Sequence, residues 1–320
     1  MHSLSRRQLL LAGGVLAAGS LLGRQAHAAE PLRVWRYKGT AASFLADAGQ
    51  ADTPYPVEWV DVSGGNLVLE ALRSGHLDYA FMSEIPPIFA SIAQLPIALV
   101  AVYQGDQNDT SLVVKKDSGI RTVADFKGKT ISYVRATNTH YFVLNMLAQN
   151  GLSLADVTAV PLPMQDALTA FRNGHVDAIA TGGIGALQAT SLMDGELLAD
   201  VSRYYSGNYV IATTQQVLAD PQRRSQVGDF LRREQATWAW VNAHPERWAE
   251  RSEALTGIDR ALYLRQFQQR SRPGRLVGID ADTIRSQQQV ADLFYQNHLI
   301  SQSVDATPLW RDDFNPILNS

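Results

Sequence analysis

A short motif occurs twice in the chain, 99 residues apart, and this repeat restricts the possible folds more than any other feature. The segments Glu70–Asp78 and Thr169–Asp177 share the pattern Ala-x-Arg-x-Gly-His-x-Asp. In each copy a helical pattern ends at a glycine, which suits the left-handed C-cap of a helix, and an aspartate opens the next apolar run. The repeat therefore predicts two similar α/β lobes. A generic helix–glycine–strand turn used twice is the alternative, but it does not explain the shared arginine, histidine and aspartate.

Strand-like and helical patterns alternate around both copies of the repeat. We expect strands at 32–36, 56–62, 77–82, 97–103, 112–115, 130–134, 157–161 and 178–181, and helices at 66–74, 87–94, 123–126, 141–150 and 164–173. Such alternation is typical of an α/β fold with mostly parallel sheets. Asp220-Pro221 resembles a helix N-cap followed by a proline in the first helical position. Helical patterns dominate after it, and we expect those helices to pack on the outside of the earlier sheets.

The first 28 residues have the layout of an export signal. Arg6 and Arg7 precede an apolar run of 14 residues, 9–22, which is too short to span a bilayer. Small residues at 26 and 28 then suit cleavage near Ala28. The order Ser-Arg-Arg-Gln-Leu-Leu from Ser5 resembles the twin-arginine export motif, with an ordinary secretory signal as the alternative. We therefore expect a periplasmic mature protein.

Composition excludes several classes of protein. The chain has no cysteine, so disulfide scaffolds, cysteine zinc sites and cysteine nucleophiles are excluded. The formal net charge is −3, and removal of the three arginines of the signal leaves 25 basic and 31 acidic residues, a net charge of −6. Such a chain is not expected to bind nucleic acid, and an anionic ligand would have to be held by local donors. Nucleotide, hydrolase and zinc-protease motifs are missing, and we expect no metal and no cofactor.

Polar loops at the ends of the predicted strands are the candidate ligand site, because ligands bind there in open α/β sheets. Two of these loops, 63–66 and 137–140, precede a helix, whose N-terminus offers unpaired N–H groups and partial positive charge to an anion. Simple helix caps are the alternative. The candidate ligand-binding residues are Tyr37, Lys38, Gly39, Thr40, Ser63, Gly64, Gly65, Ser83, Glu84, Asn138, Thr139, His140, Thr181, Gly182 and Gly183.

The chain resembles the aliphatic-sulfonate-binding proteins of ABC importers from about residue 31 to residue 250. The combination of Pro86-Pro87 with Asn138-x-His140 is closer to sulfonate binders than to relatives that bind nitrate, taurine or thiamine precursors. One departure lies after the second repeat, where many relatives carry Trp-Asp-Pro and this chain has Thr181 to Gly185. The matching segments are Asn66–Asp78, Ser83–Ala90, Lys116–Ser118, Val123–Lys129, Asn138–Tyr141 and Asp166–Asp177.

The resemblance implies a two-lobed periplasmic binding protein of type II-like architecture, with flanking helices on each sheet and a ligand cleft between the lobes. Residues 29–110 and 212–320 would form one lobe and residues 111–211 the other, joined by a hinge near 103–111 and 207–211. The protein would be a monomer that captures an aliphatic sulfonate or similar small organic anion for sulfur metabolism. It would deliver this ligand to an ABC permease. The alkyl part of the ligand would lie against Tyr37, Phe81 or Tyr141.

Enzymes are similar to this family as well. Sulfinate desulfinases and thiamine-pyrimidine synthases rely on cysteines, which this chain lacks, so we expect no enzyme. A cysteine-free enzyme with His140 and Glu84 as acid and base is one alternative. A binding protein for taurine, nitrate, an aromatic sulfonate or a thiamine precursor is another, and a binding protein that serves a sensor is a third.

Overall fold

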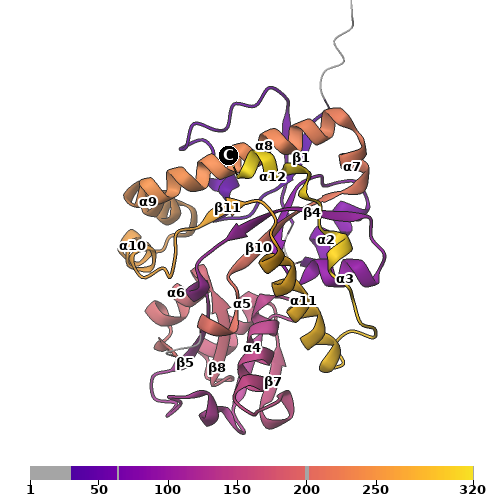
Figure 1. The fold of residues 1–320 in the computed structure, drawn as a ribbon. Helices are drawn as coiled ribbons and strands as arrows, with labels where there is room; N and C mark the ends of the chain where they lie inside the picture. The colour runs from indigo at the N-terminus through magenta and orange to yellow at the C-terminus, as the bar shows by residue number, and fades with distance from the viewer. Residues whose placement is uncertain (1–29, 63–64, 199–201, 320) are drawn as a thin grey trace, which may run out of the picture.

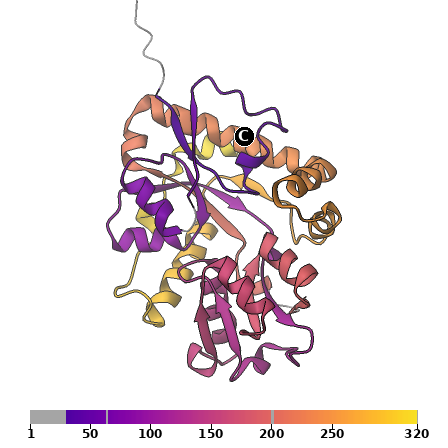
Figure 2. The same ribbon diagram turned by 180° about the vertical axis from the view of Figure 1, so that it is seen from behind.

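The computed structural model describes residues 30–62, 65–198 and 202–319 (Figure 1). The predicted signal peptide and the predicted site residues Ser63 and Gly64 lie outside these ranges. The described chain forms an upper part and a lower part, each built on its own sheet, with α11 (Ala281–Gln296) running beside both (Figures 1 and 2). Among the described residues, no helix has the length and apolar character needed to cross a membrane.

The upper part contains a four-stranded sheet in the order β11-β4-β10-β3, in which every neighbouring pair is antiparallel. A parallel pair, β1 and β2, continues this sheet through a bridge between Val34 and Tyr79. The bounds are β1 Leu32–Trp35, β2 Val57–Val60, β3 Ala80–Ser83, β4 Ile97–Gln104, β10 Asn208–Thr214 and β11 Arg275–Val277, with helices α2 Gly65–Arg73, α3 Pro86–Ile92, α7 Gln215–Ala219, α8 Pro221–Ala243, α9 Pro245–Thr256, α10 Arg260–Gln268 and α12 Asn315–Leu318.

The lower part contains a five-stranded sheet in the order β7-β6-β8-β5-β9. Only β6 pairs in parallel, with β7 and β8, whereas β5 is antiparallel to both β8 and β9. The bounds are β5 Thr110–Lys115, β6 Thr130–Tyr133, β7 Thr158–Pro161, β8 Ala178–Gly182 and β9 Gly195–Leu197, with helices α4 Asn138–Gln149, α5 Met164–Arg172 and α6 Gly183–Leu192.

The sheets are therefore mixed, and the prediction of mostly parallel sheets was wrong. The chain leaves the upper sheet after β4 and returns only with β10, which inserts between β3 and β4 in the opposite direction. The strands β3, β4 and β10 are apolar on both faces, so the sequence pattern resembles that of a buried parallel sheet. Strand direction depended on the route of the chain and not on this pattern.

The helix after Asp220 begins where the sequence predicted. The Asp220 carboxylate accepts the N–H groups of Gln222 and Arg223 at 2.8 and 3.1 Å, and Pro221 takes the first helical position. Helix α8 then runs along the top of the upper part (Figure 1). Helix α11 packs on the lower sheet, because Val290 and Phe294 belong to the apolar core of that sheet together with Ile88 of α3.

Two crossover segments, 105–109 and 206–207, connect the upper and lower sheets. They lie side by side, since the N–H of Gly105 donates to the carbonyl of Gly207 at 2.9 Å. Gly207 has φ +73°, and a Cβ atom there would lie 2.9 Å from the Gly105 carbonyl oxygen. Glycine is thus required for this close approach. The predicted lobe boundary at 211/212 falls inside β10, and the lobe assignment stays a prediction.

Candidate functional site

Asn138 lies where the lower sheet meets both crossovers. It opens α4, and its Nδ2 donates to Thr110 Oγ1 at 2.9 Å and to the Tyr209 hydroxyl at 3.3 Å. Thr110 begins β5, and Tyr209 is the second residue of β10. The Tyr209 hydroxyl donates in turn to Asp109 Oδ2 at 3.3 Å. A single amide therefore links α4 to the two strands that follow the crossovers.

The N-terminus of α4 has no side-chain cap. Thr137 occupies the N-cap position, but its Oγ1 donates to the Val134 carbonyl at 2.7 Å. Thr139 is buried, and its Oγ1 accepts the Val134 N–H at 3.0 Å. Both hydroxyls shape the preceding loop. The first N–H groups of α4 thus lack a side-chain acceptor, a feature that favours an anion at this end of the helix.

His140 is a core residue of the lower part. Its ring stacks on Tyr133 at 4.6 Å and lies 5.3 Å from the ring of Phe294. Nδ1 accepts the Ala136 N–H at 3.2 Å, which places the proton of the neutral ring on Nε2, and that buried atom has no described partner. Burial, assisted by the charge of Arg135, lowers the pKa of His140 to about 4, so the ring is neutral at neutral pH.

Glu84 is fully buried between β3, a crossover and α11. Its Oε1 accepts the hydroxyls of Ser286 at 2.8 Å and Ser206 at 3.3 Å, and its carbonyl accepts Gln287 Nε2 at 3.0 Å. Burial raises the pKa of Glu84 to about 7, against the opposing effect of these hydroxyl donors. Neighbouring Ser83 is buried as well. His140 and Glu84 are held by separate partners, so nothing described brings them together as an acid–base pair.

Thr181 and Gly182 end β8 and Gly183 begins α6, whereas the sequence predicted a strand that ends at Thr181 and a loop from Gly182. Thr181 is buried, with its hydroxyl 3.3 Å from the sulfur of Met164. A Cβ atom on Gly182 would collide with the Asp109 backbone, and the Gly183 N–H donates to the Asp109 carboxylate. Desolvation, with a smaller contribution from Asp106, raises the pKa of Asp109 to about 6.

The Tyr37–Thr40 loop lies at the surface. Thr40 Oγ1 donates to the Tyr37 carbonyl at 2.8 Å, and Gly39 has φ +89°. Lys38 and Gly39 are exposed, and the Tyr37 ring stacks on Trp35 at 5.7 Å. At the next loop, α2 begins at Gly65, where a Cβ atom would lie 2.9 Å from the ring of Pro86.

Arg272 is a residue of this region that the sequence did not reveal. It lies in the loop between α10 and β11, and it donates to the carbonyl of Gly105 at 2.6 Å and to that of Ser206 at 2.8 Å. One guanidinium therefore braces both crossovers. Nothing in the local sequence could have indicated this, because the contacts depend on the return of β10 to the upper sheet.

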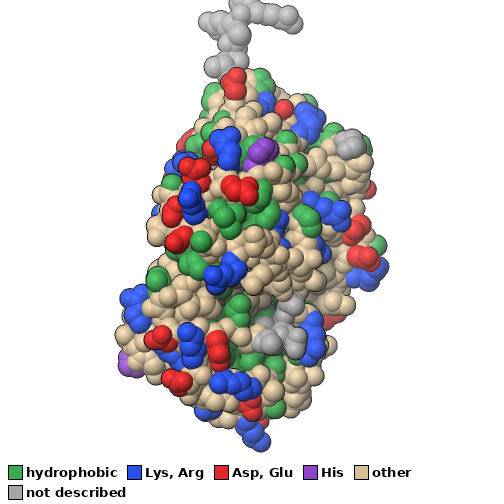
Figure 3. Space-filling view, turned by 90° about the vertical axis from the view of Figure 1, so that its left-hand side faces the viewer, with side chains coloured by type: hydrophobic (Ala, Val, Ile, Leu, Met, Phe, Trp, Pro, Cys, Tyr) green, Lys and Arg blue, Asp and Glu red, His purple; other side chains and the backbone are tan. Residues whose placement is uncertain are grey.

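The upper and lower parts also touch through α6. Ile184 and Leu187 pack on an apolar cluster that includes Ile258 and Tyr263 of the α9–α10 region. Charged side chains of both signs are interspersed over the face seen in Figure 3, which agrees with an anion site that relies on local donors. The described residues contain no cluster of three or more acidic or histidine side chains that could hold a metal ion.

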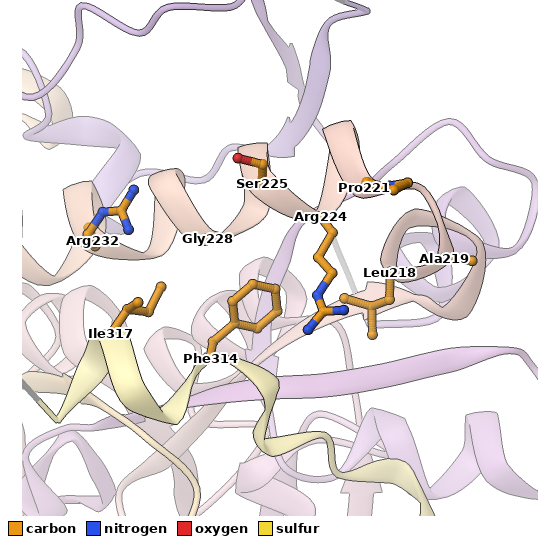
Figure 4. Close-up of a pocket in the computed structure, with 9 residues that line it drawn as sticks. All are labelled: Leu218, Ala219, Pro221, Arg224, Ser225, Gly228, Arg232, Phe314 and Ile317. Carbon is orange, nitrogen blue, oxygen red and sulfur yellow. The ribbon is translucent and has the colours of Figure 1, made fainter.

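A surface pocket of about 380 Å³ lies elsewhere, between α8 and the C-terminal segment. Phe314 and Arg224 point into it (Figure 4). Arg224 is paired with Asp313 at 3.0 Å. The pocket shares no lining residue with the predicted site.

The sequence profile of the family described as NMT1/THI5 like matches residues 56–248, more than half of the chain. The chain belongs to the NMT1/THI5-like family. A protein of Escherichia coli (strain K12), whose name assigns it to aliphatic sulfonate binding, is 29% identical over 314 residues, which cover 92% of this chain and 93% of the relative.

Two crystal structures extend the comparison. The periplasmic aliphatic sulphonate binding protein SsuA from Escherichia coli has a TM-score of 0.79 at 26% identity, and covers 88% of this chain and 92% of its own. The alkanesulfonate-binding protein SsuA from Xanthomonas axonopodis pv. citri, bound to MOPS, has the same score and identity over 88% of this chain and 98% of its own. The fold also occurs in the desulfurization enzyme DSZB, at 17% identity and a TM-score of 0.61 over 90% of this chain and 99% of that one.

Proposed function

We propose that this NMT1/THI5-like protein is the sulfonate-binding component of an ABC importer. The observation that carries the proposal is the likeness to two sulfonate-binding structures over 88% of the chain. The junction of Asn138, Thr110, Tyr209 and the uncapped α4 N-terminus supports it. A sulfonate is ionised at every physiological pH and has three acceptor oxygens, which suit an amide, hydroxyls and free backbone N–H groups.

The structure divides the predicted site residues into those proposed to contact the ligand and those proposed to position them. Asn138, with the N–H groups that open α4, is proposed to hold the anion, and Gly182 and Gly183 to keep side chains away from it. Thr139, His140, Thr181, Ser83 and Glu84 would position this junction from the core. Tyr37 to Thr40 are proposed to face the ligand from the upper part, and Ser63, Gly64 and Gly65 stay predicted ligand-binding residues.

Ligand capture is proposed to draw the two predicted lobes together about the crossovers, with residues 29–110 and 212–320 in one lobe and 111–211 in the other. The ligand would favour the closed arrangement by differential binding, and the closed form would dock on the permease. The absence of cysteine, together with the separate hydrogen-bond partners of His140 and Glu84, supports a binding protein over an enzyme. The protein would act as a monomer without a cofactor.

Thermal unfolding and calorimetry of the chain from residue 29 would test ligand binding. A sulfonate at about 100 times its Kd should add about 2.7 kcal/mol to the free energy of unfolding. The panel should contain alkane- and arylsulfonates, taurine, nitrate and sulfate. Stabilisation by another anion and by no sulfonate would contradict the proposal, and chemical turnover of the ligand would contradict its non-enzymatic part.

Asn138→Ala should weaken sulfonate binding by about 10- to 100-fold, because the Nδ2 donors that bond to Thr110 and Tyr209 would turn to a bound sulfonate and form charge-assisted hydrogen bonds with it. The matched control is Asn297→Ala, since Asn297 is an exposed asparagine whose Nδ2 donates to the Leu293 carbonyl at the end of α11. The control should bind like the unmodified protein. Equal affinities of the two variants would remove Asn138 from the site.

Export by the twin-arginine route is part of the proposal. Replacement of Arg6 and Arg7 by lysine should leave the precursor in the cytoplasm if the pair is read as a twin-arginine signal. Unchanged delivery to the periplasm would identify an ordinary secretory signal and leave the proposed ligand unaffected.

A further inference from the structure

An aromatic row crosses four neighbouring strands of the upper sheet. Trp35 of β1, Phe81 of β3, Tyr209 of β10 and Tyr103 of β4 contribute one ring each, and Tyr37 extends the row beyond β1. Along it, ring centroids lie 5.7 Å apart for Tyr37 and Trp35, 6.4 Å for Trp35 and Phe81, and 4.9 Å for Phe81 and Tyr209. The interplanar angles of these pairs are 1°, 5° and 17°, so the four rings are stacked.

The aromatic row is closed at one end and open at the other. At the closed end Tyr103 packs on Trp238 of α8 at 4.5 Å and leaves no room for a side chain at Gly274. At the open end Tyr37 has 51% of its surface exposed. Trp35, Phe81 and Tyr209 between them are only partly buried. Part of the row thus remains accessible.

At Tyr209, the aromatic row meets the polar junction proposed to hold the anion. The Tyr209 hydroxyl accepts from Asn138 Nδ2 and donates to Asp109. Gly182 and Gly183 of the lower sheet lie against Asp109, and neither presents a side chain there. An anionic group held at the α4 N-terminus would therefore have the row as the apolar surface beside it.

The stacking determines which part of each ring a ligand can contact. Trp35 lies between Tyr37 and Phe81, and Phe81 lies between Trp35 and Tyr209, because their strands are neighbours in that order. The ring planes are nearly parallel, but centroid distances of 5.7 and 6.4 Å mean that Tyr37, Trp35 and Phe81 are displaced sideways and cover one another's faces only in part, so a ligand can meet ring edges. Ring edges carry positive partial charge and prefer the negative face of another aromatic ring in edge-to-face packing. A saturated alkyl chain has no such face.

We infer that the ligand is an arylsulfonate, whose anionic group binds at the Asn138 junction and whose ring packs on the aromatic row. This inference rests on the proposed sulfonate-binding function and narrows its ligand class from sulfonates in general to arylsulfonates. It also assigns Tyr37, Trp35, Phe81 and Tyr209 as specificity-determining residues.

The test compares two ligands that differ in aromaticity and little in size, benzenesulfonate and cyclohexanesulfonate, by calorimetry on the chain from residue 29. Benzenesulfonate should bind about tenfold more tightly, since two edge-to-face contacts are lost with the saturated ring. Equal affinities, or tighter binding of cyclohexanesulfonate, would overturn the inference and leave the sulfonate proposal standing. Failure of both to bind, with binding of another anion, would overturn both proposals.

Two variants test the aromatic row itself. Tyr37→Leu changes an exposed side chain and should fold normally, and Phe81→Leu removes the central ring. Each should reduce the preference for benzenesulfonate over cyclohexanesulfonate to about threefold or less. The matched control is Tyr295→Leu, because Tyr295 is a 46% exposed tyrosine of α11 outside the row. The control should keep the tenfold preference. If both row variants keep it as well, the row does not contact the ligand and the inference fails.

Discussion

Asp78 and Asp177 occupy the same place in the two copies of the repeat, and the backbone around them is the same. Each aspartate exchanges hydrogen bonds with a residue of the neighbouring parallel strand. The Asp78 N–H donates to the Arg33 carbonyl at 2.8 Å and its Oδ2 accepts the Arg33 N–H at 3.0 Å. The Asp177 N–H donates to the Thr130 carbonyl at 2.9 Å and its Oδ2 accepts the Thr130 N–H at 2.7 Å.

The charges around the two aspartates differ. Asp78 is 1% exposed and pairs with Arg33 at 2.8 Å and with Arg223 of α8 at 2.5 Å. Asp177 is only partly buried, and among the described residues no cation lies within ion-pair distance of its carboxylate. Burying a carboxylate is costly unless it is paired. The same motif therefore needs counter-charges only in the first copy, where α8 covers it.

Asp78→Ala should produce the largest loss of stability in this comparison. It leaves Arg33 and Arg223 without their buried partner, a change that costs about 3–5 kcal/mol. Urea unfolding followed by circular dichroism measures the loss. A cost below about 1 kcal/mol would show that the two arginines are solvated without Asp78.

Arg223→Met should cost about 2 kcal/mol, because Asp78 keeps Arg33 as a partner while one charged contact is lost. Arg223 is itself 12% exposed at its side chain, so methionine can fill its space with apolar contacts. A double-mutant cycle with Asp78→Asn should give a coupling energy above about 1 kcal/mol. Additive effects would mean that the two residues act independently.

Gly75→Ala and Gly174→Ala should each cost about 1–2 kcal/mol, since an L-residue is disfavoured in the left-handed region. The two glycines have φ +72° and +74° with open space around them, so the costs should agree within a few tenths of a kcal/mol. Thermal melts of the two variants side by side measure this. Clearly unequal costs would show that the two turns are not equivalent.

Asp177→Ala should cost about 1 kcal/mol, the net value of one hydrogen bond to a partly exposed backbone N–H. No buried cation is left behind, so the loss should stay well below that of Asp78→Ala under the same urea protocol. Losses of equal size at both aspartates would mean that the backbone exchange, and not the ion pairs, carries the energy.

The sequence predicted what depends on neighbours along the chain. The helix–glycine turns of the repeat, the Asp220 cap and the helix that follows the Thr137 loop were confirmed to within a few residues, because caps and periodicity are local. Helix α6 was missed, since Gly182, Gly183 and Gly185 concealed the helical run behind them. The prediction of strand direction was wrong, because β10 comes from far along the chain and pairs antiparallel with β3 and β4.

The candidate site likewise contains residues that the local sequence could indicate and residues whose burial depends on distant segments. Asn138 could be singled out, because it follows a strand and opens a helix. The burial of Thr139, His140 and Glu84 could not be predicted, since α11 and the 206–207 crossover cover them. Tyr209 and Trp35 were not proposed for the same reason. They become neighbours of Phe81 only when β10 and β1 flank β3.

The position of β10 also fixes an order of assembly. The strands of the lower sheet come from one continuous segment, 110–197, whereas the upper sheet places β10 between β3 and β4. The upper sheet cannot complete its pairing until the whole lower segment has been made, and its contacts close long loops, which are slow to form. One edge each of β3 and β4 therefore stays unpaired until β10 is synthesised, about a hundred residues after β4. The lower sheet can thus pair its strands before the upper one, although its apolar core is complete only when α11 has been made.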